Sequence, residues 1–439
     1  MIFKRLIINI VLIIILLNCF FPYMILATTD IVPNNNSETD KVLYKEDSET
    51  KILYKEPTIN SEAGLLIEVD SGNILFDKNS TKQMNPASTT KMMTAILALE
   101  NCDLDEKATV SKNAIALVPS GYTTAKLVAG EKMSIENLLY GLMLNSANEA
   151  ANVIAEHISG SIEEFSKLMN EKAKEIGCTN TNFVNANGMH NENHYSTAED
   201  LAKIAIYGMK NEEFRKIVST VEYTLPATDV YQKNDRIMKN TNALITPSSK
   251  YFYEYAIGVK TGFTTQAGNC LVSYAEKDGI NLVCVTLKAG STTGSSSYRF
   301  ADNKNLLEYG FEAFDNKDII KKGTVIETIQ VKEATNETKY LKVITKNTVS
   351  DFISNNINLS ELEPKINLNS EISAPISKGQ KLGTITYTIN GNDYTTDLIA
   401  NSNVEQNINF ISYSLIAGII LLIVGIIFNF KIRHKSKRH

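Results

Sequence analysis

The sequence predicts an α/β (α+β) fold in which an antiparallel sheet is flanked by helices and followed by a small all-β domain. Strand-like segments stand before and after a mainly helical block, and the last third of the chain returns to short alternating segments. The 439 residues are enough for two domains, and 43% apolar with 21% charged residues is an ordinary globular composition. A net charge of -5 gives no reason to expect nucleic acid as a partner.

The first 27 residues have the pattern of an export signal. The basic pair Lys4-Arg5 precedes an apolar run over residues 6–17, and the small Ala27 suits a cleavage site. We expect a cleaved signal peptide. An uncleaved anchor and a lipoprotein modified at Cys19 are the alternatives.

Residues 28–60 are rich in Asn, Ser, Thr, Asp and Glu, and they contain two near-identical stretches that begin at Lys41 and Lys51. This composition predicts a solvated polar tether that leads into the first strand.

The first domain, residues 61–316, is predicted to open with a hairpin in which Leu65–Val69 and Ile74–Phe76 flank a turn of Asp, Ser, Gly and Asn. Apolar spacing predicts helices over Thr90–Glu100, Ile135–Leu144, Ala147–Ile158, Ile162–Ile176 and Thr197–Met209. Strands are expected at Tyr255–Val259, Cys270–Ala275 and Asn281–Leu287, before a closing helix over Tyr298–Phe311.

Residues 317–400 consist of short alternating stretches interrupted by Gly, Asn and Pro, a pattern that predicts a small antiparallel β domain. Its alternating stretches are Thr324–Val331, Tyr340–Ile344, Glu371–Ala374 and Gly383–Ile389. Since this part has no evident catalytic cluster, we expect a spacer or docking role.

The C-terminal segment Ile411–Phe430 has about twenty mainly apolar residues without a charge, enough to cross roughly 30 Å of hydrocarbon as a helix. The basic tail, residues 431–439, is then expected to stay cytoplasmic. This arrangement places everything between the signal and the anchor outside the cell.

Four cysteines remain after Cys19: Cys102, Cys178, Cys270 and Cys284. They form no Cys-x-x-Cys pair and have no neighbouring histidine cluster, so the sequence predicts no metal site and no cofactor. Their spacing leaves disulfide pairing open.

Three short motifs carry the chemistry. The first is Ser88-x-x-Lys91, at the start of an apolar helix. The second is Ser146-Ala147-Asn148 between two helical runs, and the third is Lys260-Thr261-Gly262 at the end of a strand. A single Ser-x-x-Lys also occurs by chance, for example in Ser48-Glu49-Thr50-Lys51. Three motifs in this order and on these elements are the set found in serine acyl-transfer enzymes.

With these motifs the chain resembles the D-alanyl-D-alanine carboxypeptidases, low-molecular-mass penicillin-binding proteins of the serine peptidase group. The likeness runs from about Ser61 to Leu398, through "PASTTKMMTA", "GLMLNSANEAANVIAE" and "GVKTGFTTQAGNCLV". It implies a penicillin-binding/β-lactamase-like transpeptidase domain. It also implies removal of the terminal D-alanine from peptidoglycan stem peptides, covalent binding of β-lactam antibiotics, and attachment to the bacterial cell membrane with the catalytic domain on the extracellular face.

The residue types suit this chemistry. A serine hydroxyl such as that of Ser88 is a weak nucleophile and needs a base, which Lys91 can be because positions i and i+3 share a helix face. A neutral Lys91 requires its pKa to fall by roughly three units, or about 4 kcal/mol. Burial and the positive charge of Lys260 are the expected causes.

The resemblance also implies roles in proton transfer. Ser146 would pass the proton to the leaving D-alanine amine, and Asn148 would orient Lys91 and the substrate amide. Lys260 would act electrostatically on both serine hydroxyls.

Substrate binding is implied at the third motif. The backbone N–H groups of Ser88 and Phe263 would form the oxyanion hole, beside Gly262. Thr261 and Arg299 are the candidates to receive the terminal carboxylate, and for Arg299 the alternative is an ordinary helix-surface charge.

Other functions fit the same motifs. A class A β-lactamase would carry a Glu-x-x-Leu-Asn between Asn148 and Lys260, and no such pattern occurs there. An endopeptidase or transpeptidase differs only in its products. A slow wall-binding scaffold would not need Ser88.

Overall fold

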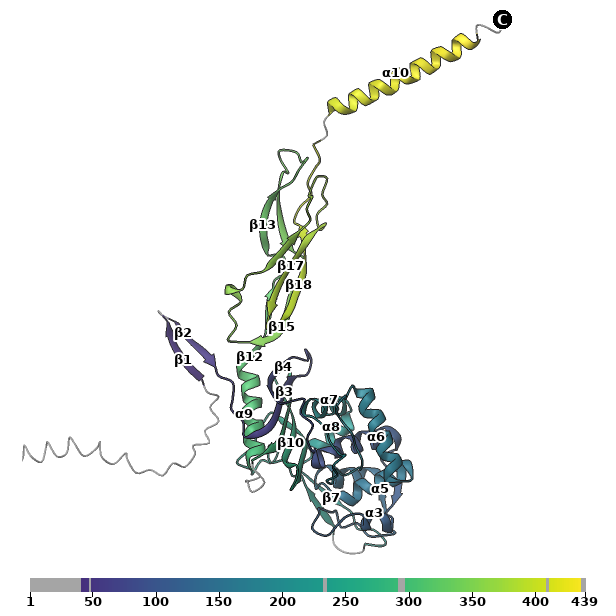
Figure 1. Ribbon diagram of the computed structural model, residues 1–439, viewed down its shortest axis with the longest axis vertical. Coiled ribbons are helices and arrows are strands. Elements are labelled where there is room, and N and C mark those ends of the chain that lie inside the picture. The colour runs from purple at the N-terminus through teal and green to yellow at the C-terminus, as the bar shows by residue number, and fades with distance from the viewer. Residues whose placement is uncertain (1–40, 47–48, 232–234, 291–296, 408–409, 436–439) are drawn as a thin grey trace, which may run out of the picture.

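The computed structural model describes residues 41–46, 49–231, 235–290, 297–407 and 410–435. Figure 1 shows a domain of sheet and helices, a slender β domain joined to it, and a C-terminal helix. The predicted signal peptide, residues 1–27, lies outside the described residues, as do residues 436–439 of the predicted basic tail.

Both ends of the first domain build one antiparallel sheet, in the order β4-β3-β11-β10-β9. The N-terminal hairpin joins the later strands where β3 pairs with β11, with Leu66 opposite Cys284. The strands are β3 Ser61–Glu68, β4 Ile74–Lys78, β9 Ala256–Thr264, β10 Gly268–Lys277 and β11 Ile280–Ala289. The predicted hairpin and the three predicted strands are confirmed.

Helices cover both faces of this sheet, which is why its strands read as almost continuous apolar runs. Successive side chains of a strand point to opposite faces, so Leu65 packs into the core under the helical block and Leu66 into the core under α9. Helix α9, Ser297–Ala313, packs on β11, β10 and β3, while α7 covers the other face.

The helices of the helical block are α2 Lys91–Asn101, α3 Lys112–Ala116, α4 Ile135–Met143, α5 Asn148–Ser159, α6 Ile162–Ile176, α7 Ala198–Met209 and α8 Glu212–Ser219. The five helices predicted for this block are confirmed as α2, α4, α5, α6 and α7, whereas α3 and α8 were not predicted. Side-chain oxygens of Ser134, Ser161 and Thr197 cap the N-termini of α4, α6 and α7. Two small antiparallel strand pairs border the block: β5 Lys107–Thr109 with β6 Lys132–Ser134, and β7 Glu222–Leu225 with β8 Arg236–Lys239.

The C-terminal domain is all β. Strand β12, Phe314–Ile320, follows α9 directly and pairs with β15, so the first strand begins three residues before the predicted boundary at 317. A five-stranded sheet has the order β13-β14-β18-β17-β16. The remaining elements are β13 Val325–Gln330, β14 Tyr340–Thr345, β15 Val349–Ser354, a 3₁₀ turn at Leu359–Glu361, β16 Lys365–Leu368, β17 Lys381–Ile389 and β18 Asn392–Ala400.

One predicted strand is wrong. Glu371–Ala374 forms no strand, and only an isolated bridge joins Ser373 to Lys332. The segment runs into Pro375, which has no N–H to donate to a ladder.

The expectation of a plain tether before the first domain also needs correction. The two near-identical stretches pair with each other as strands β1 Lys41–Glu46 and β2 Glu49–Tyr54. The carboxamide of Asn356 donates to the Tyr54 carbonyl at 2.8 Å and accepts from the Tyr54 N–H at 2.9 Å. This contact ties the end of the hairpin to the β domain.

Helix α10 spans Phe410–Lys435 and contains the predicted segment 411–430. Side chains are described there for residue 414 and residues 416–428, and they are exposed. Within the described residues, the chain has no helix that meets both the length and the apolarity needed to cross a membrane.

A buried ion pair holds the β7–β8 hairpin to the domain. Arg236 donates to the two carboxylate oxygens of Glu131 at 2.5 and 3.1 Å, and both side chains are almost fully buried. Removing one partner of such a pair leaves the other charge buried without compensation.

We therefore predict that Glu131→Gln lowers the free energy of unfolding of the first domain by about 3 to 5 kcal/mol. The double variant Glu131→Leu, Arg236→Met should lose much less free energy of unfolding, since no charge stays buried. Urea unfolding followed by near-ultraviolet circular dichroism measures both. A double variant as unstable as the single one would contradict this account.

Candidate active site

Ser88 and Lys91 meet at the junction of a 3₁₀ turn, Ala87–Thr90, and helix α2. The Thr89 hydroxyl donates to the Pro86 carbonyl at 2.7 Å and fixes the turn. Lys91 Nζ lies 2.9 Å from Ser88 Oγ. Lys91 is fully buried whereas Ser88 is half-buried, so the hydroxyl is open to a substrate and the amine is shielded from water.

Two further oxygens surround the Lys91 amine. Nζ donates to Asn148 Oδ1 at 2.9 Å and to the backbone carbonyl of Asn187 at 2.6 Å. A neutral amine has two hydrogens and one lone pair. With both hydrogens on these oxygens, its lone pair points to Ser88 and can accept the hydroxyl proton.

The surroundings favour the neutral amine. Burial lowers the pKa of Lys91 well below its usual value, and the positive charge of Lys260 lowers it further. The Glu149 carboxylate acts in the opposite direction. Both causes expected from the sequence are therefore present.

The second motif forms the turn between α4 and α5. Ser146 has a positive φ of 59°, and Asn148 is the first residue of α5. Backbone and side-chain N–H groups of Asn148 both donate to the Thr123 carbonyl, at 3.1 and 3.0 Å. This fixes Asn148 Oδ1 toward Lys91.

The third motif lies on β9, at the edge of the central sheet. Lys260 is buried, and burial together with the charge of Arg299 lowers its pKa to about 7. The Thr261 and Thr241 hydroxyls are 2.6 Å apart.

Gly262 lets β9 approach Ser88 closely. A Cβ atom at this position would lie 3.0 Å from both the Ser88 nitrogen and the Pro86 carbonyl oxygen. Phe263, the next residue, has its ring exposed beside the same space.

Arg299 reaches the third motif from the start of α9. Its Nη1 donates to the Gly262 carbonyl at 3.1 Å, and burial lowers its pKa. The guanidinium also stacks 4.8 Å from the Phe300 ring centroid. Arg299 is thus held against the site strand, unlike an ordinary helix-surface charge.

Sequence reasoning missed the loop that supplies the Asn187 carbonyl. Gly188 has a φ of +80°, and a Cβ there would lie 1.9 Å from the Ala87 carbonyl oxygen, so only glycine fits. Buried His194 hydrogen-bonds Thr90 at 2.8 Å and accepts from the Val184 N–H, which holds the loop against the turn that carries Ser88. The turn-rich "NANGM" was the available signal, but a backbone carbonyl has no sequence signature.

A cavity of about 350 Å³ opens above these groups, a volume within the range of small-molecule sites. It is lined by Ser88, Ser120, Gly121, Tyr122, Thr123, Ser146, Asn148, Gly188, Met189, Phe263, Thr264 and Thr265. The structure thus places all nine predicted site residues in one region. Five of them are outside this lining: Lys91, Lys260, Thr261, Gly262 and Arg299.

This fold and this serine–lysine geometry define a serine hydrolase that works by acyl transfer. The chain belongs to the D-alanyl-D-alanine carboxypeptidase family, whose model matches residues 49–291. A second model, for the C-terminal domain of penicillin-binding protein 5, matches residues 314–406. The catalytic and all-β parts are therefore both those of penicillin-binding proteins.

Individual relatives agree. The chain is 33% identical to D-alanyl-D-alanine carboxypeptidase DacF of Bacillus subtilis (strain 168), over 80% of this chain and 88% of that protein. The structure of D-alanyl-D-alanine carboxypeptidase DacD from Francisella tularensis superposes with a TM-score of 0.61 at 27% identity, covering 82% of this chain and 97% of that one. The Streptomyces K15 DD-transpeptidase superposes with a TM-score of 0.54 at 34% identity, covering 58% and 99%.

The electrostatic link between the two lysines gives a prediction. Lys91 accepts a proton only when neutral, so the rate of acylation by a fluorescent penicillin falls as the pH drops through the pKa of Lys91. Lys260→Gln removes a positive charge that lowers this pKa. The fall in acylation rate at acidic pH should therefore begin at a higher pH in Lys260→Gln than in the parent enzyme. Labelling rates measured across pH test this.

Glu149→Gln is the matched control, because the Glu149 carboxylate raises the pKa of Lys91. In Glu149→Gln, the fall in acylation rate at acidic pH should begin at the same pH as in the parent enzyme or at a lower pH. A shift of both variants in the same direction would contradict the role of charge.

Proposed function

We propose that this enzyme removes the terminal D-alanine from peptidoglycan stem pentapeptides through an acyl-enzyme on Ser88. The observation that carries the proposal is the buried Lys91 amine, 2.9 Å from Ser88 Oγ, with its other contacts made to two fixed oxygens. The family of the chain supplies the substrate class.

Acylation begins when Lys91 takes the Ser88 proton and Oγ attacks the carbonyl carbon of the penultimate D-alanine. The N–H groups of Ser88 and Phe263 stabilise the tetrahedral oxyanion. Loss of one such donor typically slows an enzyme by about 10²- to 10³-fold. The close approach of β9 at Gly262 supports this pair of donors.

The proton then passes through Ser146 to the nitrogen of the leaving D-alanine, and the C–N bond breaks. In deacylation, water attacks the ester and gives its proton to Lys91, which returns it to Ser88 Oγ. The half-buried position of Ser146 in the lining of the same cavity supports this role.

The free carboxylate of the substrate needs positive charge and hydroxyl donors. Lys260 and Thr261 on β9 and Arg299 at the start of α9 would supply them beside the cavity, and Asn148 lines the cavity where the substrate amide would lie. A β-lactam places its own carboxylate and strained amide in the same positions, and so it acylates Ser88 covalently.

Transpeptidation is the second candidate. It differs only in the deacylation step, where an amine takes the place of water. The similar Streptomyces K15 structure, which is that of a DD-transpeptidase, favours keeping this candidate. Endopeptidase action and a slow scaffold role remain distinguishable by products and by dependence on Ser88.

We also propose that α10 anchors the enzyme to the cell membrane, with the catalytic domain on the extracellular face. Apolar side chains along α10, such as Leu421, Leu422 and Phe428, are 65 to 72% exposed, which is unfavourable in water. The basic residues after Phe430 in the sequence fit the cytoplasmic side.

The direct test is D-alanine release from a peptide that ends in D-Ala-D-Ala, using the full chain in detergent. We expect release by the native enzyme and none by Ser88→Ala, which should also lose fluorescent penicillin labelling while it keeps its circular dichroism spectrum. Labelling that survives in Ser88→Ala would overturn the assignment of the nucleophile.

Added D-amino acids or glycyl acceptors separate the second candidate. A carboxypeptidase releases D-alanine at the same rate with or without acceptor, and no new amide product forms. Efficient acceptor incorporation in place of hydrolysis would favour transpeptidation.

The anchor has its own test. Deletion of residues 410–439 should move the enzyme from the membrane fraction to the soluble fraction in a penicillin-labelled cell lysate, with labelling of the catalytic serine unchanged. Retention of the shortened enzyme on membranes would show that α10 is not the anchor.

A further inference from the structure

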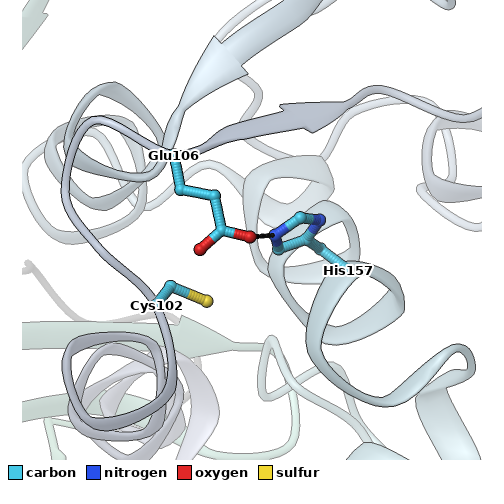
Figure 2. A group of neighbouring side chains, drawn as sticks. All are labelled: Cys102, Glu106 and His157. Carbon is cyan, nitrogen blue, oxygen red and sulfur yellow. Dashed lines mark hydrogen bonds and ion pairs between the residues drawn. The ribbon is translucent and has the colours of Figure 1, made fainter.

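Three side chains with metal-binding atoms meet away from the active site. Cys102 Sγ, a Glu106 carboxylate oxygen and a His157 ring nitrogen all lie within 4.8 Å of one another. Figure 2 shows Cys102 and Glu106, from the loop between α2 and β5, facing His157 on α5. His157 Nε2 and Glu106 Oε1 are 2.7 Å apart, and both side chains are partly exposed.

The backbone around this cluster is fixed by other contacts. Cys102 is the C-cap of α2, and its N–H donates to the Ala98 carbonyl. The N–H groups of Ile135 and Glu136, at the start of α4, donate to the Glu106 and Leu104 carbonyls, each at 2.9 Å. The loop that carries the thiol and the carboxylate is therefore held in place.

The helix that carries His157 is fixed as well. Its neighbour Glu156 accepts hydrogen bonds from the Ser111 hydroxyl at 2.6 Å and from the Asn113 amide at 2.7 Å. These bonds hold the last turn of α5 against α3.

The electrostatics favour a cation. The cluster lies at the C-terminal ends of two helices, α2 and α5, where the helix dipoles place partial negative charge. The Glu106 carboxylate adds a formal negative charge that attracts a divalent metal ion.

We propose that Cys102, Glu106 and His157 bind a divalent transition-metal ion of the zinc type, which joins the C-terminal end of α2 to that of α5. Sulfur, imidazole nitrogen and carboxylate oxygen are the ligands that zinc prefers, and a water completes a tetrahedron. On binding, the Cys102 thiol releases its proton to solvent and a sulfur–metal bond forms.

The required movement is small. Zinc–ligand bonds of about 2.0 to 2.3 Å place tetrahedral ligands roughly 3.3 to 3.6 Å apart. Atoms within 4.8 Å need to close by about an ångström, which side-chain rotation can supply because Glu106 and His157 are partly exposed. Their exposure also gives the ion a path of entry.

The position of the site gives it a structural purpose. Lys91 is the first residue of α2 and Asn148 is the first residue of α5, and these side chains meet at the other ends of the two helices. The metal would thus stabilise the pair of helices that holds the general base and the amide that orients it. It would do so from the opposite helix ends, about 14 to 17 Å from Lys91 and Asn148 along the helix axes.

The test uses the full chain in detergent, stripped of metal and titrated with Zn²⁺ against a chromophoric zinc chelator. His434 and His439 are replaced by Gln in every sample, so that the tail adds no imidazole. We expect one Zn²⁺ per chain. Cys102→Ser and His157→Gln should each weaken binding by at least about 100-fold, since even outer partners of a metal ligand contribute about 10- to 100-fold.

The matched controls are Cys178→Ser, a buried thiol outside the cluster, and His190→Gln, and both should bind as the parent does. Co²⁺ gives an independent readout, because coordination by Cys102 produces a thiolate-to-cobalt absorption band that is lost in Cys102→Ser. Glu106→Gln, a substitution at an exposed position, should also weaken binding, and it keeps the test valid if either of the other two variants fails to fold. The proposal would be overturned if the parent chain bound Zn²⁺ no more tightly than Cys102→Ser does, or if its cobalt spectrum lacked the thiolate band.

Discussion

The burial of one lysine amine is the constraint on which the active site depends. A charged Lys91 in this position would lose its hydration and face the charge of Lys260, so the neutral form is favoured and can accept the Ser88 proton. The Asn148 amide and the Asn187 carbonyl then fix the direction of its lone pair. Each of these contacts comes from a different part of the chain.

Those parts are brought together by the sheet and the two helices that start at the site. The central sheet joins β3 near the beginning of the domain to β9 and β11 near its end, and β9 is the edge strand that reaches Ser88. Helices α2 and α5 begin with Lys91 and Asn148. Small residues permit the close contacts: a Cβ on Gly188 or Gly262 would displace the turn that carries Ser88.

The β domain continues the chain without a flexible linker, because β12 begins at the residue after α9 ends. Asn73, in the β3–β4 turn, donates to Asp351 at 2.8 Å and to the Phe352 carbonyl at 3.1 Å. The Tyr394 hydroxyl donates to the same Asp351 carboxylate at 2.6 Å. These polar contacts hold the β domain against the end of the central sheet that carries the β3–β4 turn.

Apolar periodicity and residues at fixed local spacing are readable along the chain, so the main helices, the strands of the central sheet and the three motifs could be predicted from the sequence. Ser88 and Lys91, three residues apart, are such a case. Contacts between distant residues were decided only by the tertiary structure. The Asn187 carbonyl that holds Lys91 has no residue signature, and Glu371–Ala374 lost its predicted strand to a neighbouring proline. Likewise, Cys102 and His157 lie 55 positions apart in sequence, and only the packing of α2 beside α5 brings them together.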